Sequence, residues 1–159
     1  VTEKHECNLE VRLQYPMTNE QRRNYSLDVM AAVKFLHENL VAHGDIKLDN
    51  FLVSKEDKIL LSDFGESIKL DSTKSGRYTG NSMYLAPDVD INRQIVLGND
   101  LTLISYASQY SWEVGCVIYY ICCGKFPFPD GDYTSPLSFS ERLSAEFCQL
   151  LNSALDPSG

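Results

Sequence analysis

Two short stretches of the chain decide its fold: His43-Gly44-Asp45-Ile46-Lys47-Leu48-Asp49-Asn50 and, further along, Asp63-Phe64-Gly65. The first contains a His, an Asp, a Lys and an Asn in an H-x-D-x-K-x-x-N frame. With each type at roughly one residue in twenty, chance produces that frame at about one start in 10⁵. Asp-Phe-Gly alone is a common tripeptide, but its place just downstream makes the combination specific. We therefore treat both stretches as parts of one site.

The segment between the two stretches predicts a small β-hairpin. Residues 51–53 and 59–61 are short apolar β-type runs, and a charged turn at 54–58 joins them. The hairpin places Asn50 at one foot and Asp63 at the other. Both side chains are therefore expected within reach of one shared ion, although they lie 13 positions apart in the sequence.

Four side chains in these stretches fit phosphoryl transfer from a nucleoside triphosphate. That reaction needs positioning and charge neutralisation rather than covalent work by the protein, so it requires a proton acceptor, a cation and metal ligands. Asp45 can accept the proton and Lys47 supplies the cation. Asn50 and Asp63 offer the hard oxygen ligands that Mg²⁺ prefers.

At this point the sequence resembles the eukaryotic-type protein kinases, and specifically their C-terminal lobe. The resemblance implies that Asp45 orients and deprotonates a substrate hydroxyl, that Lys47 steadies the transferring phosphate, and that Asn50 and Asp63 hold magnesium. It also implies ATP and Mg²⁺ as cofactors and a protein or peptide as substrate. Lys47, two residues after Asp45, is typical of the serine/threonine group.

The resemblance names further residues for the nucleotide pocket. Leu52 would form the apolar floor under the adenine. The first residues resemble the end of a strand and the hinge of the family, where backbone groups near Glu3 and His5 would meet the adenine edge and Thr2 would be the gatekeeper. The plainer interpretation of Leu52 is an ordinary core residue.

His43 and Phe64 are expected to support the site. By resemblance, Phe64 packs beneath the magnesium loop against the ring of His43. Without the motif, a buried and hydrogen-bonded histidine is the alternative interpretation of His43.

The remaining pattern predicts an α+β, mostly α fold: a kinase-like C-terminal lobe with a short β-hairpin at the active site and a buried central helix. Thr18-Asn19-Glu20-Gln21 indicates a capping box that begins a helix ending near Asn39. The apolar run 110–123, followed by Gly124, predicts the central helix. Two stripes indicate amphipathic helices, one through Val29, Val33, Leu36 and Leu40, the other through Phe147, Leu150, Leu151, Ala154 and Leu155 after the N-cap Ser144.

Later segments extend the resemblance over nearly the whole chain. Residues 66–83 have the profile of a mobile loop. Residues 80–88 match the family's G-T-x-x-Y-x-A-P-E segment, and 112–128 match its central helix and the following turn. We therefore expect residues 1–159 to be a partial protein kinase domain, with the hinge and C-terminal lobe but without the N-terminal lobe.

Several positions depart from the family pattern. Gly44 replaces an arginine that pairs with a phosphorylated loop residue in many kinases, so loop phosphorylation is not expected to be the on-signal. Asn81 replaces a threonine and Asp88 a glutamate. Tyr110 stands where an aspartate normally anchors the catalytic loop, which means that another group holds the loop or that the alignment shifts before residue 110.

Composition limits the partners and the compartment. The net charge of −8, without a Lys/Arg run, argues against nucleic acid or an anionic membrane as partner. The five cysteines show no zinc-site spacing and are expected as reduced thiols. No signal peptide or long apolar run is visible in the sequence, so we expect an intracellular, cytoplasmic protein, with a nuclear location also open.

Three functions stay open at this level. The first is the lobe of an active protein kinase, which by itself is expected to be inactive because no glycine-rich loop is present. The second is a pseudokinase that serves as a scaffold, which Gly44, Asn81 and Tyr110 favour. The third is a small-molecule phosphotransferase of the aminoglycoside or choline kinase type, which His43-Gly44-Asp45 with Asn50 fits but Lys47 and Asp-Phe-Gly do not.

Overall fold

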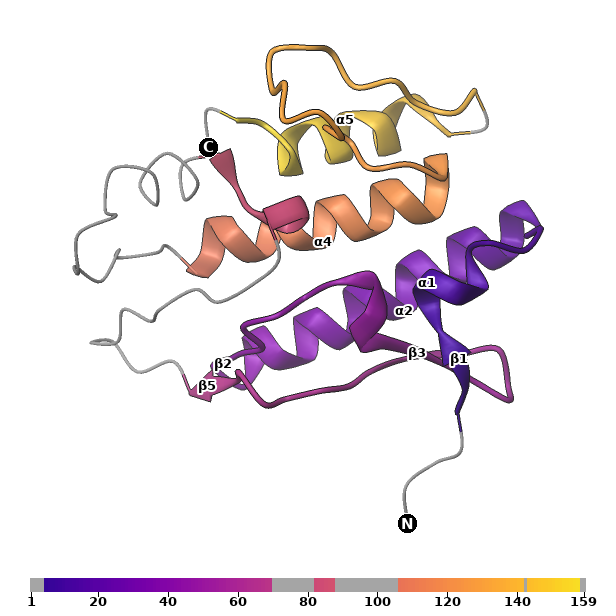
Figure 1. Ribbon diagram of the computed structural model, residues 1–159, viewed down its shortest axis with the longest axis vertical. Helices are drawn as coiled ribbons and strands as arrows, with labels where there is room; N and C mark the ends of the chain where they lie inside the picture. The colour runs from indigo at the N-terminus through magenta and orange to yellow at the C-terminus, as the bar shows by residue number, and fades with distance from the viewer. Residues whose placement is uncertain (1–4, 70–81, 88–105, 142, 158–159) are drawn as a thin grey trace.

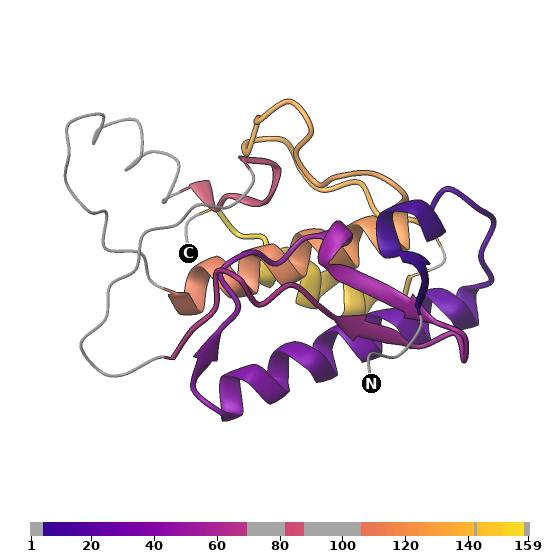
Figure 2. The ribbon, with the colours of Figure 1, turned by 60° about the horizontal axis from the view of Figure 1, so that its bottom comes forward.

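The computed structural model describes residues 5–69, 82–87, 106–141 and 143–157 of the chain (Figure 1). Figure 1 shows helix α4 between helix α5 and helix α2, with strands β1 and β3 on the side of α4 opposite α5. Figure 2 shows α2 along the lower edge and the hairpin above it. Helices account for more of the described residues than strands, as expected for a mostly α fold. The elements are β1 (His5–Asn8), α1 (Leu9–Arg12), α2 (Asn19–Glu38), β2 (Val41–Ala42), η1 (Leu48–Asn50), β3 (Phe51–Ser54), β4 (Ile59–Leu61), β5 (Ile68–Lys69), η2 (Ser82–Tyr84), α4 (Tyr106–Cys123) and α5 (Ala145–Ala154).

The capping box at the start of α2 is confirmed. The Thr18 hydroxyl accepts a hydrogen bond from the Gln21 amide at 3.1 Å, and the Gln21 side chain accepts one from the Thr18 amide at 3.1 Å. The helix ends at Glu38 with Asn39 as its C-cap, as predicted. Leu40 does not continue the apolar stripe, because it lies outside the helix with a φ of 53° and is 57% exposed.

The predicted hairpin is also confirmed. Strands β3 and β4 pair antiparallel with Phe51 opposite Leu61, and β1 adds to the other edge of β3. The Ser54 amide donates to the Lys58 carbonyl at 2.9 Å, which closes the turn. At the open end the Ser62 amide donates to the Asn50 carbonyl at 2.8 Å, so the two feet of the hairpin are held together.

A second, two-stranded sheet next to the hairpin was not predicted. Strand β5 pairs antiparallel with β2, with Ala42 opposite Ile68 and Val41 opposite Lys69. The predicted mobile loop over 66–83 did not anticipate this strand at Ile68–Lys69 or the 3-10 turn η2, and 70–81 lies outside the described residues. Two-residue strands are too short for an alternating pattern to be visible in sequence.

Helix α4 is the buried central helix. It begins at Tyr106, four residues before the predicted start, and ends at Cys123; Gly124 follows with a φ of 73° and donates its amide to the Tyr120 carbonyl at 2.8 Å. Most of its described side chains are buried, although Ser111 is exposed, so burial on all sides was an overestimate.

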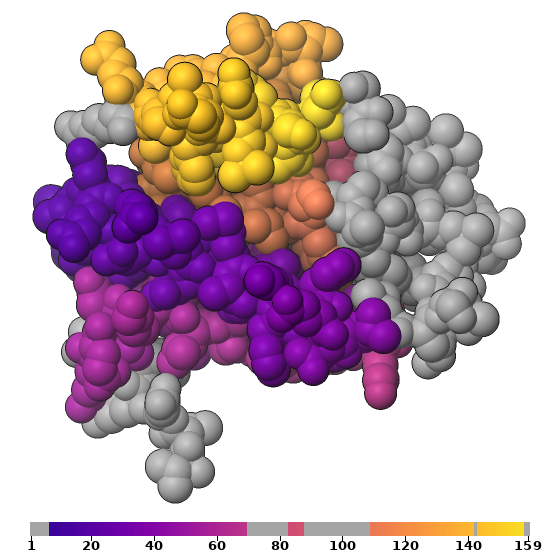
Figure 3. Space-filling model, turned by 180° about the vertical axis from the view of Figure 1, so that it is seen from behind, coloured from indigo at the N-terminus to yellow at the C-terminus, as the bar shows by residue number. Residues whose placement is uncertain are grey.

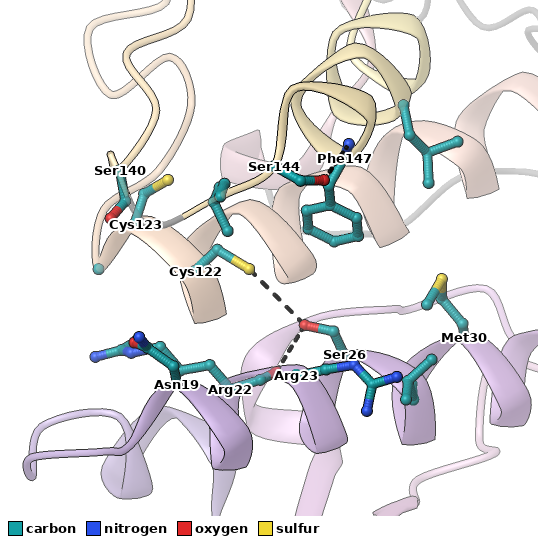
Figure 4. A pocket seen from close by; sticks show the side chains of 14 residues that line it. Asn19, Arg22, Arg23, Ser26, Met30, Cys122, Cys123, Ser140, Ser144 and Phe147 are labelled. Atoms are coloured by element: carbon teal, nitrogen blue, oxygen red, sulfur yellow. Dashed lines mark hydrogen bonds between the residues drawn. The ribbon is translucent and has the colours of Figure 1, made fainter.

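Helix α5 packs against α4 through only part of its predicted stripe. Ser144 caps the helix by accepting from the Phe147 amide at 3.3 Å, as predicted. Leu151 and Leu155 are buried, whereas Leu150 is 55% exposed. Leu150 instead borders a groove of about 740 Å³ between α2, α5 and the end of α4. Figure 3 shows the face where α2 and α5 lie on either side of α4, and Figure 4 shows the groove with Phe147 and Ser26 on opposite walls.

Within the described ranges, no helix combines the length and apolar character needed to cross a membrane.

Candidate active site

His43 is a buried residue of the site that makes hydrogen bonds to Asp45 and Ser62. Its side chain is 0% exposed, and its Nδ1 accepts a hydrogen bond from the Asp45 amide at 3.3 Å. Its Nε2 therefore carries the ring proton and donates to the Ser62 carbonyl at 2.9 Å. The Phe64 ring packs edge-on at 4.9 Å between centroids, as predicted. Burial lowers the pKa of His43, so the ring is held neutral and both sequence interpretations of His43 apply together.

Asp45, Lys47 and Asn50 meet at one carboxylate oxygen. The Lys47 ammonium lies 2.6 Å from Asp45 Oδ2, and the Asn50 amide nitrogen donates to the same oxygen at 3.0 Å. The hydrogen bond to Asp45 raises the pKa of Lys47, which keeps the ammonium protonated. Because both donors among the described residues use Oδ2, Oδ1 is the oxygen left to accept a proton from a substrate.

Asn50 is held in place on three sides. It ends the 3-10 turn η1, is 5% exposed, and donates its amide nitrogen to the Asp45 carbonyl at 2.7 Å as well as to the carboxylate. Its own carbonyl accepts from the Ser62 amide and hydroxyl, both at 2.8 Å. Both of these side-chain hydrogen bonds use the amide nitrogen, so the side-chain oxygen can serve as a metal ligand.

Asp63 stands at the other foot of the hairpin and is exposed. Its φ of 60° is in the left-handed region, which aspartate tolerates better than most residues. The Gly65 amide approaches its Oδ1 at 3.4 Å, a long hydrogen bond. The charge of Asp63 also contributes to raising the pKa of Lys47, after the larger effect of Asp45, so the two carboxylates share one electrostatic environment with the ammonium.

Gly44 occupies a position that no other residue fits without rearrangement. Its φ is 85°, and a Cβ built there would lie 2.5 Å from the Glu66 carbonyl oxygen. The arginine found here in many kinases is therefore excluded by the backbone of the segment after Asp63.

The segment 43–50, called the catalytic loop here after the kinase resemblance, also contacts two tyrosine hydroxyls. Tyr110 accepts a hydrogen bond from the Gly44 amide at 3.1 Å, and Tyr84 accepts one from the Leu48 amide at 3.1 Å. The sequence analysis expected that Tyr110 could not supply the usual carboxylate and that another group holds the loop or the alignment shifts. In the structure the hydroxyl of Tyr110 itself contacts the loop. Tyr84 was missed as a site residue, because the Tyr-x-Ala-Pro-Asp string gives no sign of which amide its hydroxyl meets.

The nucleotide-pocket residues are only partly described. Leu52 is half-buried in β3, paired with Asn8 on one side and Leu60 on the other. His5 begins β1 opposite Ser54. The other positions expected to matter, Thr2, Glu3, Asn81 and Asp88, lie outside the described residues, so their contacts stay predictions.

The donor set fits Mg²⁺ bound together with phosphates rather than a metal bound by protein alone. The described part of the chain has no group of three or more His, Cys, Asp or Glu side chains that could hold a metal by itself. Mg²⁺ commonly uses one or two protein oxygens and completes its shell with substrate phosphates and water. One amide oxygen and one exposed carboxylate, on Asn50 and Asp63, match that requirement.

Comparison with known proteins agrees with this geometry. Residues 1–155 match the protein kinase domain family. The chain is 32% identical to the human RAC-beta serine/threonine-protein kinase over 146 residues and 30% identical to the serine/threonine-protein kinase akt-2 of Caenorhabditis elegans over 149 residues. These alignments cover 84% of this chain but 28% and 25% of the two relatives, respectively.

A third relative extends the comparison. The probable serine/threonine-protein kinase KIN1 homolog of Encephalitozoon cuniculi is 27% identical over 138 residues, covering 86% of this chain and 23% of that protein. The chain thus spans about a quarter of the length of these three relatives. By its family match and by its relatives, the chain belongs to the eukaryotic-type protein kinases.

Proposed function

We propose that this chain is the hinge and C-terminal lobe of a protein kinase that transfers the γ-phosphate of ATP to a serine or threonine hydroxyl of a protein, with Mg²⁺. The observation that carries the proposal is the meeting of Lys47 and Asn50 at Asp45 Oδ2, with Asp63 at the adjoining foot of the hairpin. The names of the three relatives described above, each of which includes serine/threonine-protein kinase, support the choice of acceptor.

Each side chain has a distinct task in this mechanism. Asp45 orients the substrate hydroxyl and takes its proton at Oδ1, while Lys47 steadies the transferring phosphate. Asn50 and Asp63 would hold the metal. Bound ATP supplies the phosphoryl group, and Mg²⁺ neutralises the charge on its phosphates. His43 holds the loop from below by accepting from the Asp45 amide and donating to the Ser62 carbonyl.

The chain by itself is expected to transfer phosphate slowly or not at all. Its sequence contains no G-x-G-x-x-G loop to cover the phosphates, and Asp63 is exposed to solvent. Water weakens the fixed electrostatic interactions on which such catalysis depends. An N-terminal lobe in the complete domain would supply the missing cover.

A scaffold without catalysis is the second function to test. Gly44 and Tyr110 depart from the family pattern, but both have a defined place in this structure: Gly44 fits against Glu66, and Tyr110 contacts the loop. They therefore do not argue for loss of chemistry. The four residues proposed for catalysis, Asp45, Lys47, Asn50 and Asp63, are all present.

The five cysteines support an intracellular location. All of them are free thiols, and none forms a disulfide. Free thiols are typical of reducing compartments.

The decisive experiment measures phosphate transfer by the full-length protein. Purified protein is incubated with labelled ATP, with and without Mg²⁺, and a mixed protein substrate, and the products are hydrolysed for phosphoamino-acid analysis. We expect Mg²⁺-dependent phosphoserine or phosphothreonine. Absence of turnover, with ATP binding retained, would favour the scaffold; transfer to a small aminoglycoside or choline acceptor but to no protein would establish the third alternative.

A further inference from the structure

Two tyrosine hydroxyls accept the backbone amides on either side of Asp45. The Gly44 amide, one residue before Asp45, donates to the Tyr110 hydroxyl, and the Leu48 amide, three residues after it, donates to the Tyr84 hydroxyl, both at 3.1 Å. The two tyrosines come from different elements, α4 and η2. The loop that presents Asp45 is thus connected to two separate parts of the fold.

Helix α4 also holds the segment that contributes the second tyrosine. Gln109, next to Tyr110 in the sequence, donates to the Tyr84 carbonyl at 2.9 Å and accepts from the Ala86 amide at 3.0 Å. Gln109 is 1% exposed and Tyr84 is 4% exposed, so these bonds are protected from water. Two consecutive residues of one buried helix therefore fix both the catalytic loop and the Tyr84 segment.

We propose that Tyr110 is a positioning residue of the kinase reaction, whose hydroxyl sets the place of Asp45 by accepting the Gly44 amide. We call this contact, together with the hydrogen bonds of Gln109 and Tyr84 described above, the brace. This inference rests on the proposed function. Tyr110 acts through Gly44 and does not contact substrate. The brace joins groups 66 positions apart, Gly44 and Tyr110, so it reports on tertiary placement rather than on local turn geometry.

The phenol suits this task because of where Gly44 lies. Gly44 has a positive φ and immediately precedes Asp45, so a rotation of the 44–45 peptide would redirect the carboxylate. Leaving a half-buried amide without an acceptor is costly, and the Tyr110 hydroxyl on α4 supplies that acceptor to Gly44. Errors of about 1 Å in the place of a catalytic group can lower rates about a hundredfold.

The test compares Tyr110→Phe with Tyr119→Phe in the full-length protein. Tyr119 lies on the same helix and is fully buried, and its hydroxyl donates to the Ser138 carbonyl at 2.6 Å, away from the catalytic loop. Each variant removes one hydroxyl from α4 and, with it, the hydrogen bond described here. We expect Tyr110→Phe to lower kcat by about ten- to a hundredfold with KM for ATP within about twofold, and Tyr119→Phe to leave both within about twofold.

Hydrogen exchange at single amides gives a readout that does not depend on activity. The Gly44 amide should exchange about tenfold faster in Tyr110→Phe than in the wild type, while Tyr119→Phe should leave it unchanged. Equal kcat losses in the two variants, or unchanged Gly44 exchange in Tyr110→Phe, would overturn the proposal. If Tyr110→Phe does not fold, the wild type decides: protection of Gly44 comparable to α4 supports the brace, and exchange as fast as in an open loop refutes it.

The outcomes separate this inference from the proposed function. If the wild type shows no phosphate transfer but Tyr110→Phe still speeds exchange of the Gly44 amide, the anchoring contact stands and the kinase reaction is refuted. A fully active Tyr110→Phe protein would support the kinase reaction and refute the positioning role of Tyr110.

Discussion

The two halves of the candidate site are held in very different ways. In the catalytic loop, His43 is completely buried, Asn50 is 5% exposed, and Asp45 receives bonds from Lys47 and Asn50. In the segment that begins at Asp63, by contrast, Asp63, Gly65 and Glu66 are exposed and the Phe64 ring is 47% exposed. The catalytic loop is therefore held by packing within this chain, whereas the segment that begins at Asp63 is open to solvent.

This difference indicates which part of the reaction each half can support alone. The polar groups of the catalytic loop are bonded to protein, so Asp45, the proposed proton acceptor, is held in place by contacts within this chain. Asp63 has a long hydrogen bond from the Gly65 amide, and a metal with its phosphates would add the contacts that fix it. Substitutions in the catalytic loop should consequently lower both activity and stability, whereas substitutions at Asp63 should lower activity alone.

The largest expected effect is on the chemical step, from Asp45→Asn. Removing the proton acceptor should lower kcat by about 10²- to 10⁴-fold, because general base catalysis contributes an effect of that size. The measurement is steady-state phosphate transfer by the full-length protein, with circular dichroism to show that the fold is intact. Asp130→Asn, at an exposed position, is the control and should keep wild-type turnover. Wild-type rates in Asp45→Asn would remove this carboxylate from the mechanism.

The comparison between the halves is sharpest in the exchange pair Asp63→Asn and Asn50→Asp. Asp63→Asn should weaken Mg²⁺-dependent activity by about a hundredfold or more, through loss of a charged ligand, and change the unfolding free energy by less than about 0.5 kcal/mol. Asn50→Asp should lower both, with a stability loss of about 1–3 kcal/mol, because it replaces a donor by an oxygen facing Asp45 Oδ2.

These two variants need calorimetric ATP titrations with Mg²⁺ and with EDTA, alongside urea unfolding. Equal stability losses for Asp63→Asn and Asn50→Asp would contradict the division of the site into a packed half and an open half.

Gly44→Ala tests the junction between the halves. At a φ of 85°, any residue with a Cβ costs about 1–2 kcal/mol, and the contact of 2.5 Å with the Glu66 carbonyl adds to it. Gly131→Ala is the matched control, because Gly131 has a φ of 70° but nothing within 4 Å of its Cβ position. We expect urea unfolding to show a larger loss for Gly44→Ala, and equal losses would show that Glu66 moves away freely.

The smallest expected effect is a pH dependence from His43. Burial lowers the folded-state pKa of His43 below its usual value of 6.5, so the unfolded chain takes up a proton first as the pH falls. The stability due to neutral His43 is fully present above pH 6.5 and is lost as the pH falls toward the folded-state pKa. Urea midpoints at pH 7.5 and 5.5 should therefore differ more in the wild type than in His43→Gln. The same difference in both proteins would assign the pH dependence to other groups.

Much of the local structure could be predicted because its causes are local. The capping box of α2 depends on Thr18 and Gln21 alone, and strand β4 formed at the predicted residues. The bonds of Lys47 and Asn50 to Asp45 are also local in sequence, although the sequence analysis assigned these two side chains to the phosphate and the metal instead. Spacing within one element or one turn is sufficient information for such features.

The rest depends on contacts between distant segments. The bonds of Gln109 to Tyr84 and Ala86 link segments more than twenty residues apart, and nothing in either string identifies the partner. Tyr110 was interpreted as a loss because it carries no carboxylate, although a phenol oxygen can accept an amide as well. Leu40 followed the helical period but lay one residue beyond the C-cap, where the period no longer applies.

The groove in Figure 4 is lined by two cysteine thiols that can be labelled chemically. Cys122 and Cys123 line it, and the Cys122 sulfur lies 3.9 Å from the Ser26 hydroxyl across the space between α4 and α2. Burial raises the pKa of Cys122, so its thiolate is scarce at neutral pH and alkylation should accelerate as the medium becomes more alkaline. The rate at which a maleimide labels this thiol would thus measure, without any substrate or nucleotide, how open this groove is in solution.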